Sequence, residues 1–177
     1  MRIAVYCSSS VKVAPENLQL GFDLGAAIAA AGHDLVWGGG KISVMGTVAE
    51  GARSKGGTTI GVIPERLMNI EFIDNDSHEL LVVKDMRERK GKIEELSDAF
   101  LVLPGGIGTL EEFFEIWVGR YLGFHEKPIA VLDPYGSYGS LRVALDELTE
   151  KHFMKPGQHD KVFWSKSISD VLTYLSK

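Results

Sequence analysis

The chain has 177 residues, of which 45% are hydrophobic and 24% are charged, and its formal net charge is -5 at pH 7. This length fits one domain with a full core, and the acidic balance argues against a general nucleic-acid binder or a membrane-surface binder. The single cysteine, Cys7, excludes an internal disulfide, and the opening MRIAVYC lacks the apolar run of a signal peptide, so we expect a cytoplasmic protein.

Short β-branched runs alternate along the chain with longer segments of helical period. The expected strands are residues 3–7, 34–38, 58–63, 79–83, 99–104 and 128–133. The expected helices are residues 15–31, 44–55, 86–97, 109–122, 138–152 and 167–176. Continuous apolar runs are typical of parallel strands covered on both faces. The alternation therefore predicts a single-domain, Rossmann-like α/β fold over residues 1–177, a doubly wound parallel sheet with helices on both faces.

Polar and glycine-rich segments follow four of the predicted strands. They are CSSS after the first, GGG after the second, KDMRERK after the fourth and PGGIGT after the fifth. Ligands of open parallel sheets bind beyond the carboxyl ends of the strands, where the strand order reverses. If the order is 3-2-1-4-5, the first and fourth predicted strands flank that point, and all four segments can line one crevice.

The stretch LPGGIGTLEEFFEIW joins a glycine turn to a helical segment rich in glutamate. Glycines let the backbone approach a ligand closely, and the N–H groups of a helix that starts near Thr109 would face a phosphate there. A plain tight turn is the alternative for the glycines. Glu111 and Glu112 lie in the first turn of that helix, where a carboxylate can also simply stabilise the helix dipole.

A basic cluster, Arg87, Arg89, Lys90 and Lys92, follows the fourth predicted strand. A charge run of this kind is typical of a solvated helix face. Its position near the glycine turn favours ligand contact for at least one arginine, because a guanidinium can grip a phosphate or a carboxylate with two hydrogen bonds.

Familiar cofactor and metal motifs are missing from the sequence. CSSS stands where a GxGxxG dinucleotide fingerprint would follow the first strand, and no GxxxxGK[ST] P-loop or HExxH occurs. The five histidines show no metal-ligand spacing. We therefore expect neither a metal nor a bound cofactor.

Two of these segments carry a family resemblance. PGGIGTLEE matches the PGGxGTxxE motif, and MRERK matches the MxxRK motif, of the LONELY GUY family of cytokinin riboside 5'-monophosphate phosphoribohydrolases, which are often labelled lysine decarboxylase-like. VYCSSS, VWGGGKISVMG, GVIPERL and HEKPIAVLD also resemble family segments, so the similarity extends over nearly the whole chain.

The resemblance implies hydrolysis of the N-glycosidic bond of an adenine-type nucleoside 5'-monophosphate, AMP or a cytokinin riboside 5'-monophosphate, by a homodimer. It places the catalytic residues at Arg89 and Glu112. The substrate-binding residues that it implies are Glu71, Lys90, Gly105, Gly106, Ile107, Gly108, Thr109, Leu110 and Glu111. A glutamate beside an oxocarbenium-like ribosyl cation could stabilise it or activate water, while Arg89 is expected to position groups, since arginine is a poor proton donor.

Three positions depart from the family pattern, and two other functions stay open. Arg87 replaces a common histidine, while Ser8 and Ser43 replace glycines; these departures leave the preference between bases open. One alternative is a nucleotide-binding module without catalysis. The other is a decarboxylase, which would need pyridoxal phosphate on a lysine such as Lys90.

Overall fold

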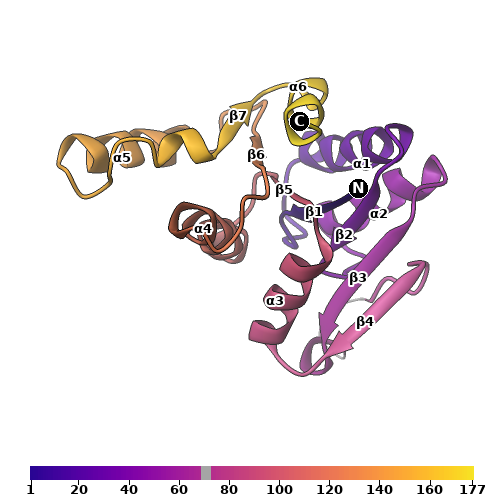
Figure 1. The fold of residues 1–177 in the computed structure, drawn as a ribbon. Coiled ribbons are helices and arrows are strands. Elements are labelled where there is room, and N and C mark those ends of the chain that lie inside the picture. The colour runs from indigo at the N-terminus through magenta and orange to yellow at the C-terminus, as the bar shows by residue number, and fades with distance from the viewer. Residues whose placement is uncertain (69–72) are drawn as a thin grey trace.

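The computed structural model describes residues 1–68 and 73–177, and this part of the chain forms one parallel sheet with the strand order β4-β3-β2-β1-β5-β6-β7 (Figure 1). The strands are β1 (Arg2–Tyr6), β2 (Asp34–Trp37), β3 (Thr59–Pro64), β4 (Glu79–Val83), β5 (Ala99–Val102), β6 (Ile129–Leu132) and β7 (Phe163–Ser165). The predicted α/β fold class with a doubly wound parallel sheet is confirmed.

Helices connect the strands and cover both faces of the sheet (Figure 1). They are α1 (Pro15–Ala30), α2 (Ser43–Ser54), α3 (Met86–Leu96), α4 (Ile107–Leu122), α5 (Gly139–Glu150) and α6 (Ile168–Leu175), with short 3-10 turns η1 (Glu65–Leu67) and η2 (His159–Lys161). Each predicted helix is present, but α4 begins at Ile107 rather than near Thr109.

Alternate residues of each central strand serve two separate hydrophobic cores. In β1, Ile3 and Val5 pack against α1, α2 and α6, whereas Ala4 and Tyr6 join the core beneath α3 and α4. All four side chains are less than 5% exposed. Burial on both faces explains why these strands read as unbroken apolar runs in the sequence.

The assumed strand order is wrong at one place. β4 pairs with β3 at the edge of the sheet, and β5 is the strand that pairs with β1 on the side opposite β2. The chain therefore runs outward from β1 to β4, returns through α3, and continues outward on the other side. The order reverses between β1 and β5, and that point lies directly before the glycine turn and α4.

The sequence did not predict β7, which pairs with β6 and carries only three residues, Phe163–Ser165. Between β6 and β7, α5 extends away from the rest of the molecule (Figure 1). Within residues 1–68 and 73–177, every helix is too short or too polar to cross a bilayer.

Candidate active site

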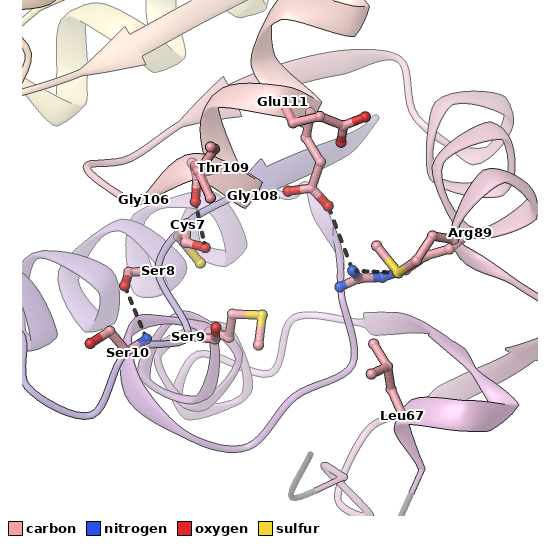
Figure 2. A pocket seen from close by; sticks show the side chains of 14 residues that line it. Cys7, Ser8, Ser9, Ser10, Leu67, Arg89, Gly106, Gly108, Thr109 and Glu111 are labelled. Atoms are coloured by element: carbon pink, nitrogen blue, oxygen red, sulfur yellow. Dashed lines mark hydrogen bonds and ion pairs between the residues drawn. The ribbon is translucent and has the colours of Figure 1, made fainter. Parts of the chain in front are cut away.

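A crevice of about 420 Å³ lies beyond the carboxyl ends of β1 and β5. Its lining is Cys7, Ser8, Ser9, Ser10, Met45, Leu67, Met86, Arg89, Gly106, Ile107, Gly108, Thr109, Glu111 and Glu112. Figure 2 shows the Ser8–Ser10 loop below the turn from Gly106 to Thr109, with Arg89 reaching in from α3. The volume is within the range of small-molecule sites, roughly 300–1,000 Å³.

The glycine turn leaves the start of α4 open toward this crevice. Gly106 is the N-cap of α4 and, within the described chain, receives no side-chain cap. The first intrahelical bond runs from the Leu110 N–H to the Gly106 carbonyl at 3.0 Å, so the N–H groups of residues 107–109 have no partner within the helix. Three donors and the positive end of the helix dipole make this a favourable place for an anion.

A threonine fixes that turn to the first strand. The Thr109 hydroxyl donates to the Cys7 carbonyl at 3.0 Å and is buried. Gly105 lies so close to Thr109 that an added Cβ would come within 2.2 Å of the hydroxyl oxygen. Only glycine at position 105 therefore lets the turn close against the end of β1.

Capping of α3 aims the basic cluster. The Asp85 carboxylate accepts the N–H groups of Arg87 at 2.9 Å and Glu88 at 3.0 Å, and these bonds, the Glu88 bond foremost, lower the pKa of Asp85. Asp85 is thus the N-cap, and α3 begins at the next residue, Met86. Arg89 and Lys90 consequently fall within the first two turns, facing α4.

Two backbone carbonyls hold the buried guanidinium of Arg89. Its Nε donates to the Val62 carbonyl at 3.1 Å and its Nη2 donates to the Gly38 carbonyl at 3.3 Å. A Cβ on residue 38 would come within 1.9 Å of that nitrogen. Glycine after β2 therefore makes room for the arginine, and the side chain cannot move freely toward other partners.

The remaining face of the guanidinium points at Glu112. Nη1 of Arg89 lies 3.7 Å from Oε1 of Glu112, an ion pair longer than an ordinary hydrogen bond. Burial raises the pKa of Glu112 to about 7, although Arg89 opposes this shift, and Glu111 adds to it. A carboxyl group that titrates near neutral pH inside a crevice is a candidate for proton transfer or charge stabilisation.

Lys90 of α3 binds two glutamates of α4, Glu111 and Glu115, and we call these three residues the clamp. The Lys90 ammonium is paired with Glu111 and lies 2.7 Å from Glu115. Burial lowers the pKa of Lys90, but the hydrogen bonds to the two carboxylates outweigh that effect and leave the pKa raised. The clamp thus keeps a positive charge between two glutamates rather than in the crevice.

The crevice gathers most of the predicted site residues, but three described ones lie outside its lining. Arg89, Glu112, Gly106, Ile107, Gly108, Thr109 and Glu111 line it. Gly105 packs beneath the turn, Leu110 packs against the core under α4, and Lys90 belongs to the clamp. Glu71 lies outside the described residues.

One lining residue was not anticipated individually. Leu67 comes from η1, and in the sequence it stands out only as part of GVIPERL, one of the segments that resemble the family. Among residues 1–68 and 73–177, no group of three His, Cys, Asp or Glu side chains is placed to hold a metal ion.

The three departures from the family pattern have distinct surroundings. Ser43 has a φ of 57°, a conformation that favours glycine, and its hydroxyl donates to the Ser10 carbonyl at 2.6 Å. Ser8 is buried and accepts the Ser10 N–H at 3.1 Å. Arg87 is exposed and lines a neighbouring cavity with Pro64 rather than the crevice.

Comparisons with known proteins place the chain among known relatives. A family model described as "Possible lysine decarboxylase" matches residues 45–175. The chain is 46% identical over 170 residues to a cytokinin riboside 5'-monophosphate phosphoribohydrolase of Mycobacterium tuberculosis, with 96% of this chain and 90% of that protein covered. It is 35% identical over 176 residues to an enzyme of the same name from Arabidopsis thaliana, with 99% and 82% covered.

Solved structures share the fold. A molybdenum cofactor binding protein from Rippkaea orientalis superimposes with a TM-score of 0.74 at 22% identity, covering 99% of this chain and 94% of that one. The molybdenum cofactor carrier protein of Chlamydomonas reinhardtii gives a TM-score of 0.72 at 22% identity, covering 99% and 98%. At this level of identity the likeness concerns the fold alone.

Proposed function

Since this chain belongs to the LONELY GUY family, whose model is described as "Possible lysine decarboxylase", and is a phosphoribohydrolase like its relatives, we propose that its substrate is an adenine-type nucleoside 5'-monophosphate. AMP and a cytokinin riboside 5'-monophosphate both have this chemistry. The reaction breaks the N-glycosidic bond with water and releases the free base and ribose 5-phosphate.

The phosphate rests on the glycine turn at the start of α4. The N–H groups of Ile107, Gly108 and Thr109 supply its hydrogen bonds, because none is used within the helix. An added Cβ at Gly106 or Gly108 would meet no atom within 4 Å, so these residues leave open space for a ligand. Phosphate binding there fixes the ribose within reach of the next turn of the helix.

Glu112 acts on the glycosidic bond. As the bond to the base lengthens, positive charge develops on the ribosyl ring, and a carboxylate near the anomeric carbon stabilises it. As the bond to the base breaks, water adds to the anomeric carbon and its proton passes to the carboxylate. The carboxylic acid then returns this proton to the leaving nitrogen of the base, so that the carboxylate is regenerated. The raised pKa of Glu112, about 7, suits a group that takes and returns a proton near neutral pH.

Arg89 positions this carboxylate. Its hydrogen bonds to Val62 and Gly38 leave Nη1 to face Glu112 at 3.7 Å. The single observation that carries the proposal is this pairing of a fixed guanidinium with a buried carboxylate, one helical turn from N–H donors that have no partner within their helix.

The decarboxylase alternative is less compatible with the surroundings of Lys90. A lysine that forms a Schiff base must lose its proton to attack a carbonyl. Lys90 is instead held between Glu111 and Glu115, which keep its pKa raised. This lysine is suited to bridging helices rather than to nucleophilic chemistry.

Chromatographic separation of products tests the proposal. The wild-type protein is incubated with AMP and, separately, with isopentenyladenosine monophosphate, and free base and ribose 5-phosphate are quantified. We expect both products in equal amounts, and we expect Glu112→Gln to lose roughly 10²–10⁴-fold in rate. The matched control is Glu95→Gln, which removes an exposed carboxylate paired with Lys92 on α3.

Two results would contradict the proposal. Full activity of Glu112→Gln would remove the carboxylate from the mechanism. A wild-type protein that binds AMP without releasing base would support the nucleotide-binding module instead.

We also propose that the chain forms a homodimer. Large apolar side chains are exposed near the end of α4 and along the α5 region, namely Val118, Leu122, Phe124, Val143 and Phe153, each more than 50% exposed. Val118 and Phe124 line one cavity beside α4, and contiguous exposed apolar groups are typical of interaction surfaces. Light scattering is expected to give twice the mass of the 19.4 kDa chain, and a monomer at micromolar concentration would contradict this.

A further inference from the structure

A buried tyrosine from a distant part of the chain lies behind the glycine turn. Tyr138 is the residue before α5 and is only 5% exposed. It does not line the crevice. Its ring packs edge-on against Trp164 of β7, with centroids 6.3 Å apart, and belongs to the core beneath α4.

The hydroxyl of Tyr138 lies within hydrogen-bond distance of three backbone groups that lead into the turn. It accepts the Gly105 N–H at 2.8 Å. It can donate its proton to the Leu103 carbonyl at 3.2 Å or to the Gly105 carbonyl at 3.3 Å. Backbone groups buried at this point need such partners, because unpaired buried donors and acceptors are costly.

The tyrosine is itself held firmly from the end of β6. The two carboxylate oxygens of Asp133 accept the N–H groups of Ser137 and Tyr138, each at 2.9 Å. Burial, more than any other cause, raises the pKa of Tyr138 to about 12, so the hydroxyl keeps its proton near neutral pH. A series of hydrogen bonds thus connects Asp133 through Tyr138 to Gly105, which precedes the N-cap of α4.

We propose that Tyr138 is a positioning residue for the phosphate site: its hydroxyl holds the backbone at Gly105 so that the N–H groups at the start of α4 converge on the phosphate of the substrate. It touches no ligand and takes no part in bond cleavage. The inference rests on the proposed function for the identity of the ligand, but not for the contacts that carry it.

Two competitive ligands separate this role from a general structural one. Ribose 5-phosphate reports on the phosphate site, and adenine reports on the base site alone. Tyr138→Phe keeps the ring and removes only the hydroxyl. We expect the dissociation constant of ribose 5-phosphate to rise roughly 3- to 10-fold, the equivalent of one net hydrogen bond, while that of adenine stays unchanged. KM for the nucleotide should rise by the same factor, with kcat changing less.

The neighbouring tyrosine provides the control. Tyr135 is 53% exposed and its hydroxyl donates to the Glu16 carbonyl at 3.4 Å, away from the glycine turn, so Tyr135→Phe should bind both ligands like the wild type. Should Tyr138→Phe fold poorly, Asp133→Asn weakens the anchor of Tyr138 while keeping the hydroxyl, and we expect a smaller shift in the same direction.

Binding measured by calorimetry, together with the hydrolysis assay, separates the positioning role of Tyr138 from the proposed function. Unchanged ribose 5-phosphate binding in Tyr138→Phe overturns the positioning role, and so does an equal loss for ribose 5-phosphate and adenine. A wild-type protein that binds ribose 5-phosphate but hydrolyses no nucleotide overturns the proposed function and leaves the role of Tyr138 testable.

Discussion

Two sets of ion pairs join α3 to α4 at adjacent positions, and they differ in burial and in closeness. Arg89 and Glu112, with side chains 9% and 13% exposed, approach only to 3.7 Å. Lys90 and Glu115, with side chains 17% and 48% exposed, approach to 2.7 Å, and Glu111 also pairs with Lys90. The tighter contacts are thus those nearer to solvent.

The difference follows from what else each cation binds. Arg89 gives two of its donors to the carbonyls of Val62 and Gly38, which prevents it from closing on Glu112. Lys90 has a flexible stem and settles between its two glutamates. Burial raises the pKa of Glu112 to about 7, and Arg89 at 3.7 Å does not cancel that shift. Lys90, by contrast, contacts both of its carboxylates closely. We therefore expect the clamp to contribute to stability and the Arg89–Glu112 pair, the loose pair, to contribute to reactivity.

After loss of Glu112 itself, breaking the loose pair at its cation should have the largest effect on activity. Arg89→Gln removes the group that lowers the pKa of Glu112 and that fixes the carboxylate. We expect kcat/KM to fall roughly 100-fold, the size of loss caused by misplacing a reacting group. Because activity requires the ionised carboxylate, the rising limb of the pH profile, expected near the Glu112 pKa of about 7 in the wild type, should move to higher pH.

A neighbouring arginine separates position from charge. Arg87→Gln removes the same charge from an exposed site outside the crevice, and it should leave the pH profile in place. If both substitutions move the rising limb by the same amount, the shift comes from the net charge of the protein. The position of Arg89 beside Glu112 would then have no special effect on the pKa of Glu112.

Neutralising the buried carboxylate should stabilise the protein, with an effect that depends on pH. The folded-state pKa of Glu112 is raised, to about 7, so ionising this group costs folding free energy. That cost is absent below the ordinary glutamate pKa of roughly 4.3, grows as pH rises, and is complete above the folded-state value. Glu112→Gln should raise the free energy of unfolding by about 3–4 kcal/mol at about pH 8.

Urea unfolding at about pH 8 and about pH 5 measures this difference. We expect the gain from Glu112→Gln to shrink to about 1 kcal/mol at the lower pH, where the folded carboxyl group is protonated but the unfolded one, with a pKa of roughly 4.3, is still mostly ionised. An equal gain at both values would mean that the substitution acts through packing rather than charge. Glu95→Gln, at an exposed position of α3, should show neither effect.

Local patterns predict most of the site, but not what fixes it. The glycine turn, the basic run and Glu112 are recognisable because their spacing along one segment carries the chemistry. The carbonyls that hold Arg89 belong to Val62 and Gly38, 27 and 51 residues away, and Tyr138 is 33 residues from Gly105. Such contacts depend on strand order, and the order assumed from the sequence was wrong at β4 and β5.

Smaller features fail for local reasons. β7 has only three residues, too few for an apolar periodicity to stand out, and its place depends on pairing with β6. Ser43 has a φ of 57°, a conformation that residues with a side chain do not favour. The hydrogen bond from its hydroxyl to the Ser10 carbonyl stabilises this conformation. Tertiary contacts decide both, and neither alters the fold class that the alternation of strands and helices predicts.

Substitutions in the clamp should have the smallest effects on the pH profile. The direction of these shifts tests most sharply whether the two sets of ion pairs act differently on Glu112. Glu111 raises the pKa of Glu112, and Glu115 does so less. Glu111→Gln and Glu115→Gln should therefore move the rising limb of the pH profile to lower pH, opposite to Arg89→Gln, with the larger shift for Glu111. A partly freed Lys90 ammonium would act in the same direction, since it also lowers that pKa. A shift to higher pH in either variant would mean that the clamp controls the position of α4, because no charge it carries could then account for the change.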